Sequence, residues 1–243
     1  RVKQNMKVGI IMKNSMVEKI MELNRKIESI TMKTTSYFSF GEKQNLNNYD
    51  RQIIEYYQEI LNLIIEIAKR EEIKNVEIID NKYFEVVNTA SMMIEEYLSI
   101  LQFYGNIDRN ITKREIDVIN QIQENLKLDV ALEIKNKIEL ADCYFKSGNE
   151  NKARKLILEF IKNSPDEDEA YMCMQNWYMY DRPDINKLAE VIDLAEENKH
   201  ILITDFGYDR LVKFYDSVGD IKNREKYQEF YDNWKKKRET IEF

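Results

Sequence analysis

The chain has 243 residues, among them only six glycines and two prolines, and carries 37 lysines and arginines against 44 aspartates and glutamates. Sheet proteins need glycine or proline at their many tight turns, and Pro/Gly-rich disordered chains contain far more of both, so the composition argues against these two classes. The net charge of −7 argues against binding to nucleic acid through the overall field of the protein. A nearly all-helical protein remains.

Cysteine content and hydropathy bear on the compartment. Cys143 and Cys173 are too few for a disulfide framework, and we expect both to be reduced. No apolar run approaches the roughly 20 residues that a membrane span requires. We therefore expect a cytoplasmic protein without membrane association.

Apolar residues recur at steps of three or four, the spacing of amphipathic helices, as in Ile53, Tyr57, Ile60 and Ile64. This pattern predicts about ten helices, over residues 7–31, 48–72, 81–105, 112–127, 130–147, 150–163, 166–181, 184–198, 203–218 and 221–240. Residues 75–79 are ambiguous and also fit a short extended connector. Residues 32–47 have the weakest periodicity and predict a loop or hinge.

Local signals predict where several helices begin and end. Thr112 followed by Glu115 matches a capping box, and Ser164 with Pro165 and Glu167 matches a second helix start. Glycine favours the left-handed conformation that often ends a helix. The glycines expected at helix ends are Gly105, Gly148 and Gly219.

Tyrosines mark an internal period, because 34 residues separate Tyr144 from Tyr178 and 37 separate Tyr178 from Tyr215. A 34-residue helix–turn–helix unit is the tetratricopeptide period. Residues 134–167 carry the pattern of one unit, with the positions Leu140, Ala141, Tyr144, Gly148, Ala153, Ile157 and Pro165.

The chain resembles the tetratricopeptide-repeat family over these residues and, more weakly, over two further units. The resemblance implies an all-α fold, a right-handed α-solenoid of antiparallel helix pairs. We divide the chain into an N-terminal helical region, 1–129, and tetratricopeptide-like repeats with a C-terminal helix, 130–243.

In this family the first helix of each unit lines a concave groove that holds a peptide. Carried over by register, the peptide-binding residues are Asp142, Phe145, Met172, Asn176, Met179, Tyr180, Arg210 and Lys213. The amide of Asn176 can bond a peptide backbone as donor and acceptor, and Arg210 or Lys213 can pair with a carboxylate. Met172 and Met179 offer an adaptable apolar surface.

Signals of catalysis are nearly absent. His200 is the only histidine, so the Glu197-x-x-His200 spacing lacks the second copy that a di-iron site needs. No glycine-rich phosphate loop is present. We expect no enzymatic activity, no catalytic residues, no metal and no cofactor.

Two functions stay open at this point. The first is a non-enzymatic scaffold that binds a peptide or protein segment in its groove, with no direct contact to nucleic acid and with a homodimer as an open possibility. The alternative is the ligand-sensing domain of a bacterial peptide-pheromone-responsive transcriptional regulator, without its DNA-binding domain in these residues. The degenerate repeats and the start at Arg1 rather than Met are compatible with that alternative.

Overall fold

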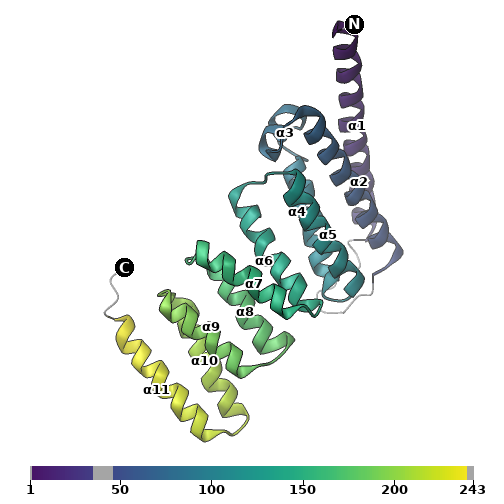
Figure 1. Cartoon of the computed structure of the whole chain (residues 1–243). Helices are drawn as coiled ribbons and strands as arrows, with labels where there is room; N and C mark the ends of the chain where they lie inside the picture. The colour runs from purple at the N-terminus through teal and green to yellow at the C-terminus, as the bar shows by residue number, and fades with distance from the viewer. Residues whose placement is uncertain (1, 35–45, 240–243) are drawn as a thin grey trace. The chain divides into compact units, whose positions relative to one another are not determined.

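The structure, a computed structural model, describes the backbone of residues 2–34 and 46–239 and the side chains of residues 15–32 and 46–239. Within these residues the chain forms eleven α-helices and one π-helical segment, and no β-strand (Figure 1). The predicted all-α fold is confirmed. Contacts divide the chain into two compact units, residues 1–147 and 148–243. The boundary predicted at residue 130 concerns sequence repeats and stays a prediction.

Unit 1 builds its core from helices that pack in chain order. Its described helices are α1 (Val2–Thr34), α2 (Asn48–Glu71), α3 (Val76–Tyr83), α4 (Ala90–Gly105), α5 (Arg109–Asn125) and α6 (Val130–Lys146). α1 packs on α2, α2 and the short α3 on α4, α4 on α5, and α5 on α6. The rings of Tyr57 and Tyr97 stack between α2 and α4, with centroids 5.7 Å apart.

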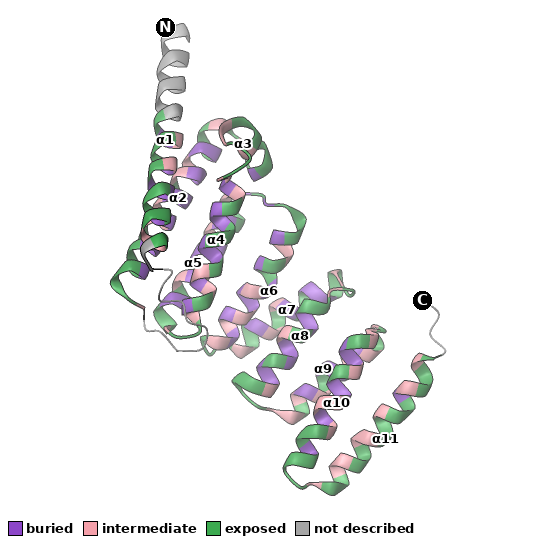
Figure 2. Ribbon diagram, turned by 180° about the vertical axis from the view of Figure 1, so that it is seen from behind, coloured by how far each residue is buried: buried purple, intermediate pink, exposed green. Residues whose placement is uncertain are grey.

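Unit 2 repeats the same arrangement of neighbouring helices. It comprises α7 (Glu150–Asn163), α8 (Asp168–Asn176), the π-helical segment η2 (Trp177–Asp181), α9 (Ile185–Glu197), α10 (Ile201–Ser217) and α11 (Ile221–Arg238). Each helix packs on the next, and α10 also contacts α8. Trp177, Ile192, Leu211 and Trp234 are buried among them. Figure 2 shows buried residues along the inner sides of the helices.

The region from residue 75 to residue 105 differs from the prediction. Residues 76–83 are helical, so the extended alternative for 75–79 is wrong, and the predicted helix 81–105 is interrupted between Tyr83 and Ala90. Two side chains fix the start of α4: the hydroxyl of Thr89 accepts from the N–H of Met92, and the carboxylate of Asp80 accepts from the N–H groups of Ala90 and Ser91 at 2.6 and 3.3 Å. A helix N-terminus is thereby fixed at α4.

Two predicted helix starts are wrong. α5 begins after Asp108, whose side chain accepts from the N–H of Asn110, so Thr112 and Glu115 lie inside the helix and are buried. The Thr112 hydroxyl instead donates to the carbonyl of Gly105 at 2.8 Å. Ser164 ends α7, and α8 starts at Asp168 without a side-chain cap.

Glycine placement is largely confirmed. Gly148 and Gly219 have φ angles of 100° and 71° and follow α6 and α10. Gly105 is the last residue of α4, but it is not among the positive-φ glycines. The loop predicted for residues 32–47 lies largely outside the described residues, and residues 32–34 belong to α1.

One glycine inside a helix marks a close approach. A Cβ atom on Gly207 of α10 would lie 2.4 Å from Cγ1 of Ile192 on α9, well inside van der Waals contact. Alanine normally stabilises a helix interior by about 1 kcal/mol relative to glycine. Here the clash opposes that gain.

We therefore expect Gly207→Ala to lower the free energy of unfolding by about 1–3 kcal/mol, because overpacking outweighs helix propensity. Urea denaturation followed by circular dichroism measures the change. In the double variant Gly207→Ala/Ile192→Ala, the loss should be smaller than the sum of the two single losses, because the clashing atoms are gone. Additive losses would show that the Ile192 contact is not the cause.

Candidate functional site

The residues predicted to bind a peptide fall on both units. Asp142 and Phe145 belong to α6 of unit 1, and the others belong to α8, η2 and α10 of unit 2. Phe145 is 0% exposed and is therefore a core residue. The carboxylate of Asp142 is half-buried and pairs with Nζ of Lys146 at 2.5 Å. The candidate site thus reduces to the unit 2 residues.

A buried amide joins α8 to α10. Gln175 is 1% exposed, and its Nε2 donates to the carbonyl of Ile203 at 3.2 Å. Its Oε1 accepts a hydrogen bond from Nη1 of Arg210 at 3.1 Å. Both ends of the amide are therefore satisfied, and the guanidinium of Arg210 is held at the edge of the core. Sequence reasoning singled out the neighbouring Asn176 and missed Gln175.

Both helices that Gln175 connects also carry exposed side chains. Met172 and Asn176 each come one residue after a buried residue of α8, Tyr171 and Gln175, and both are exposed, Met172 by 45%. On α10, Phe206 lies one turn before Arg210 and is 57% exposed. We call the following residues the α8–α10 face: Met172, Asn176, Tyr180, Phe206, Arg210 and Lys213.

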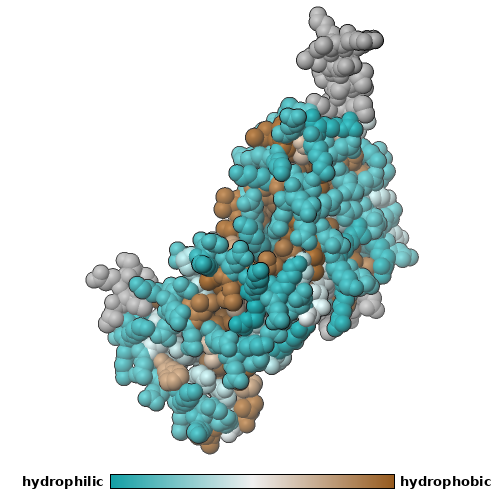
Figure 3. Space-filling model, viewed as in Figure 1, coloured by the Kyte–Doolittle hydropathy of each residue, from teal (hydrophilic) through white to brown (hydrophobic). Residues whose placement is uncertain are grey.

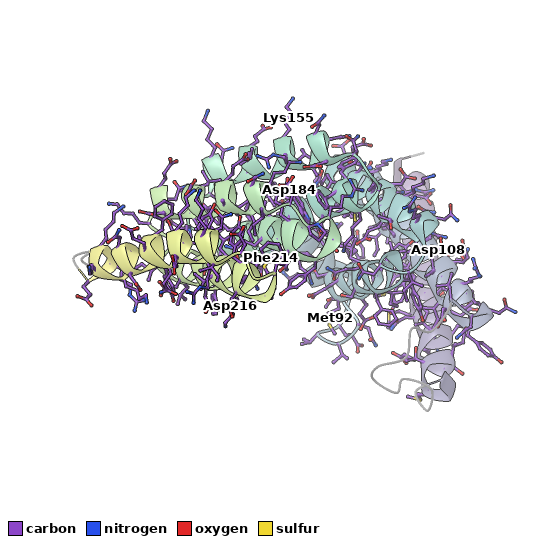
Figure 4. All side chains as sticks on the ribbon, turned by 90° about the horizontal axis from the view of Figure 1, so that it is seen from below. Met92, Asp108, Lys155, Asp184, Phe214 and Asp216 are labelled. Atoms are coloured by element: carbon purple, nitrogen blue, oxygen red, sulfur yellow. The ribbon has the colours of Figure 1, made fainter. Side chains whose placement is uncertain are left out.

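Apolar and polar groups are mixed on this surface. Figure 3 shows apolar side chains at the surface of the region that contains α8 to α11, surrounded by hydrophilic ones. Phe214, further along α10, is also partly exposed (Figure 4). Nζ of Lys213 pairs with Asp209 at 2.7 Å, one turn earlier on the same helix. The Gln175-bound Arg210 is therefore the more rigidly placed cation of the face.

The π-helical segment places the aromatic end of the face. The N–H of Arg182 donates to the carbonyl of Trp177 at 2.8 Å, a five-residue step, just before Pro183. Trp177 is buried, Met179 is half-buried, and Tyr180 is 66% exposed. π-Helical turns are rare and often lie at functional sites. Here the wider turn leaves the side chain of Trp177 in the core and that of Tyr180 at the surface.

His200 has a structural role. Its Nδ1 lies 2.8 Å from a carboxylate oxygen of Asp168, and its Nε2 contacts the carbonyl of Pro165. The ring lies against Tyr171, with centroids 4.5 Å apart. The imidazole thus ties the start of α10 to the start of α8.

Unit 1 contains a cavity of about 610 Å³ between α1, α2 and α4, which the sequence did not predict. Its walls include the apolar side chains of Ile27 and Met92 and the acidic side chains of Glu28, Glu95 and Glu96. Met92 is labelled in Figure 4. The hydroxyl of Tyr57 donates to Glu96 at 2.7 Å, and this acidic lining favours cationic over anionic ligands.

Only one group of His, Cys, Asp or Glu side chains in the described residues is close enough to hold a metal ion. It consists of Glu115 on α5 with Glu139 and Cys143 on α6, and it lies outside the α8–α10 face.

No family model matches the chain, and the search of curated proteins found no match. Among the described helices, none is both long enough and apolar enough to cross a membrane.

We expect Gln175→Met to lower the free energy of unfolding by about 1–2 kcal/mol, because Arg210 loses its buried acceptor while the volume of the side chain is kept. Urea denaturation measures the loss. The neighbouring exposed substitution Asn176→Ala is the matched control and should change stability by less than about 0.5 kcal/mol. Equal losses in the two variants would show that the hydrogen bonds of Gln175 do not stabilise the packing of α8 on α10.

Proposed function

We propose that the chain is a non-enzymatic helical-repeat scaffold that binds a peptide or protein segment across the α8–α10 face. The observation that carries this proposal is that exposed apolar and amide side chains stand on α8, η2 and α10, and that a buried glutamine of α8 holds an arginine of α10 in place. Exposed apolar side chains grouped with fixed polar ones are typical of recognition surfaces.

The register of the repeat supports the same surface. α8 and α10 are the first helices of two successive predicted repeat units, and these helices line the groove in the tetratricopeptide family. α8 and α10 contact each other directly, as this interpretation requires. The regulator alternative would use the same face, and it stays a prediction.

The face favours a particular peptide chemistry. Met172 and Phe206 provide apolar contacts, and methionine adapts to side chains of varied shape. Asn176 can bond a peptide backbone through its donor and its acceptor, and Arg210 favours a carboxylate or carbonyl oxygen. We therefore expect an extended segment with apolar side chains and at least one acidic group.

Peptides selected from a random library on the immobilised full chain should lose binding to the variant Asn176→Ala/Lys213→Ala by at least about tenfold, since two polar contacts of roughly 1 kcal/mol each are removed. Fluorescence anisotropy measures the dissociation constant, and circular dichroism checks that the helical signal is unchanged. Unchanged affinity would remove these two residues from the site.

The apolar part of the face has its own test. Phe206→Ala should weaken the same peptides by about ten- to hundredfold, because an aromatic contact of roughly 1–3 kcal/mol is lost. Phe230→Ala, a matched change of a partly exposed phenylalanine on α11, should leave the affinity unchanged. If both variants bind equally, or if the library yields no ligand, the proposed function is wrong.

A further inference from the structure

A buried group of three potential metal ligands lies between α5 and α6, within unit 1. Glu139 and Cys143 are one turn apart on α6, so their side chains emerge from the same side of the helix. Glu115 reaches them from α5, which packs directly on α6. One oxygen of each carboxylate and the sulfur all lie within 4.8 Å of one another.

Two oxygen atoms of this group have unused coordination capacity. Glu115 is 1% exposed, yet its buried Oε1 has no hydrogen-bond partner among the described residues. Oε1 of Glu139 is likewise buried and without a partner. Glu115 also shares hydrogen bonds with Glu139 and Cys143, but the two Oε1 atoms keep capacity for a further ligand.

The surroundings hold the two carboxyl groups in place. Nε2 of Gln102 on α4 donates to the other oxygen of Glu139 at 2.6 Å, which orients that carboxylate. A Cβ atom on Gly105 would lie 3.0 Å from Oε2 of Glu115. The glycine therefore leaves room for the carboxyl group, and a side chain there would push it away.

Burial shifts the proton equilibria of the two carboxyl groups. Burial, followed by the charge of Glu139, raises the pKa of Glu115 well above its ordinary value. Burial, followed by Asp142, raises the pKa of Glu139 in the same direction. The charge of Lys146 acts in the opposite direction on both carboxyl groups, and its Nζ also pairs with Asp142 at 2.5 Å.

Burial acts on the thiol of Cys143 in the same direction. Its pKa is raised by burial and then by the neighbouring Glu115 and Glu139. The other lysine that acts on Glu139 is Lys135, whose Nζ also lies 3.7 Å from Glu95. A metal ion binds these three groups only in their deprotonated forms, so binding would displace their protons.

We propose that Glu115, Glu139 and Cys143 bind one divalent transition-metal cation of the zinc class. A thiolate ligand selects zinc-like cations over Mg²⁺ or Ca²⁺, which prefer oxygen alone. Three protein ligands leave a fourth position of a tetrahedral site for water or another small ligand. On binding, the two carboxyl groups and the thiol release whatever protons they hold to solvent.

Such a site would join α5 to α6. The three ligands come from two neighbouring helices of one unit, so an ion that binds the folded state stabilises unit 1 by mass action. The site is remote in sequence from the α8–α10 face and does not depend on the proposed function, so either proposal can fail alone.

Titration of the chelator-treated full chain with Co²⁺ at pH 8 tests the proposal. We expect one equivalent to bind, with a near-ultraviolet sulfur-to-cobalt charge-transfer band that one equivalent of Zn²⁺ abolishes. Cys173→Ser is the matched control because it removes the other cysteine, and it should keep the band. Cys143→Ser should lose the band.

Carboxylate variants complete the experiment. Glu115→Gln and Glu139→Gln should each weaken Zn²⁺ binding at least about tenfold in isothermal titration calorimetry, and should abolish the rise in Tm that Zn²⁺ gives to the wild-type chain. If Cys143→Ser does not fold, the spectrum of the Cys173→Ser chain still decides the case. Absence of a charge-transfer band in that chain, or a band that Cys143→Ser retains, would overturn the proposal.

Discussion

The close approach of α10 to α8 and α9 is the constraint on which the candidate binding face depends. Gly207 permits it, since the space of a Cβ atom there is already taken by Ile192 and lies 3.2 Å from the amide of Gln175. At this separation Gln175 reaches both the backbone of α10 and Arg210. The two helices are thereby held together at this point by a buried side chain rather than by flexible surface side chains.

Much of the helical architecture follows from local pattern. The helix predicted over 150–163 is observed at Glu150–Asn163, and the one predicted over 48–72 is observed at Asn48–Glu71. The missed break before α4 has a physical reason. Val87 continues the helical period of the preceding segment but is exposed. The start of α4 is fixed by Thr89, whose side chain accepts from the N–H of Met92, and by Asp80, which accepts from the N–H of Ala90 ten residues further along the chain. Apolar periodicity alone does not detect these two caps.

Helical register predicted which residues of the candidate site share one side of a helix, but not which side is exposed. Register places Met172, Asn176 and Tyr180 on the outer side of their segment, and all three are exposed. The same reasoning put Phe145 on a surface, although it is fully buried, because exposure depends on what packs against a helix. Glu115 is the converse case. Its sequence pattern predicted a capping residue at a helix start, but it is a buried residue inside α5.

The two units bury polar side chains in contrasting ways. In unit 2 the amide of Gln175 has a donor and an acceptor as partners, so its burial adds a rigid joint and leaves no capacity for a further ligand. In unit 1 the carboxyl groups of Glu115 and Glu139 each keep a buried oxygen without a partner among the described residues. Burial favours their neutral forms, which lowers the cost of desolvation, as the raised pKa values of both groups indicate. The contrast between a fully bonded amide in unit 2 and open carboxyl oxygens beside a thiol in unit 1 is what the proposed metal site would resolve.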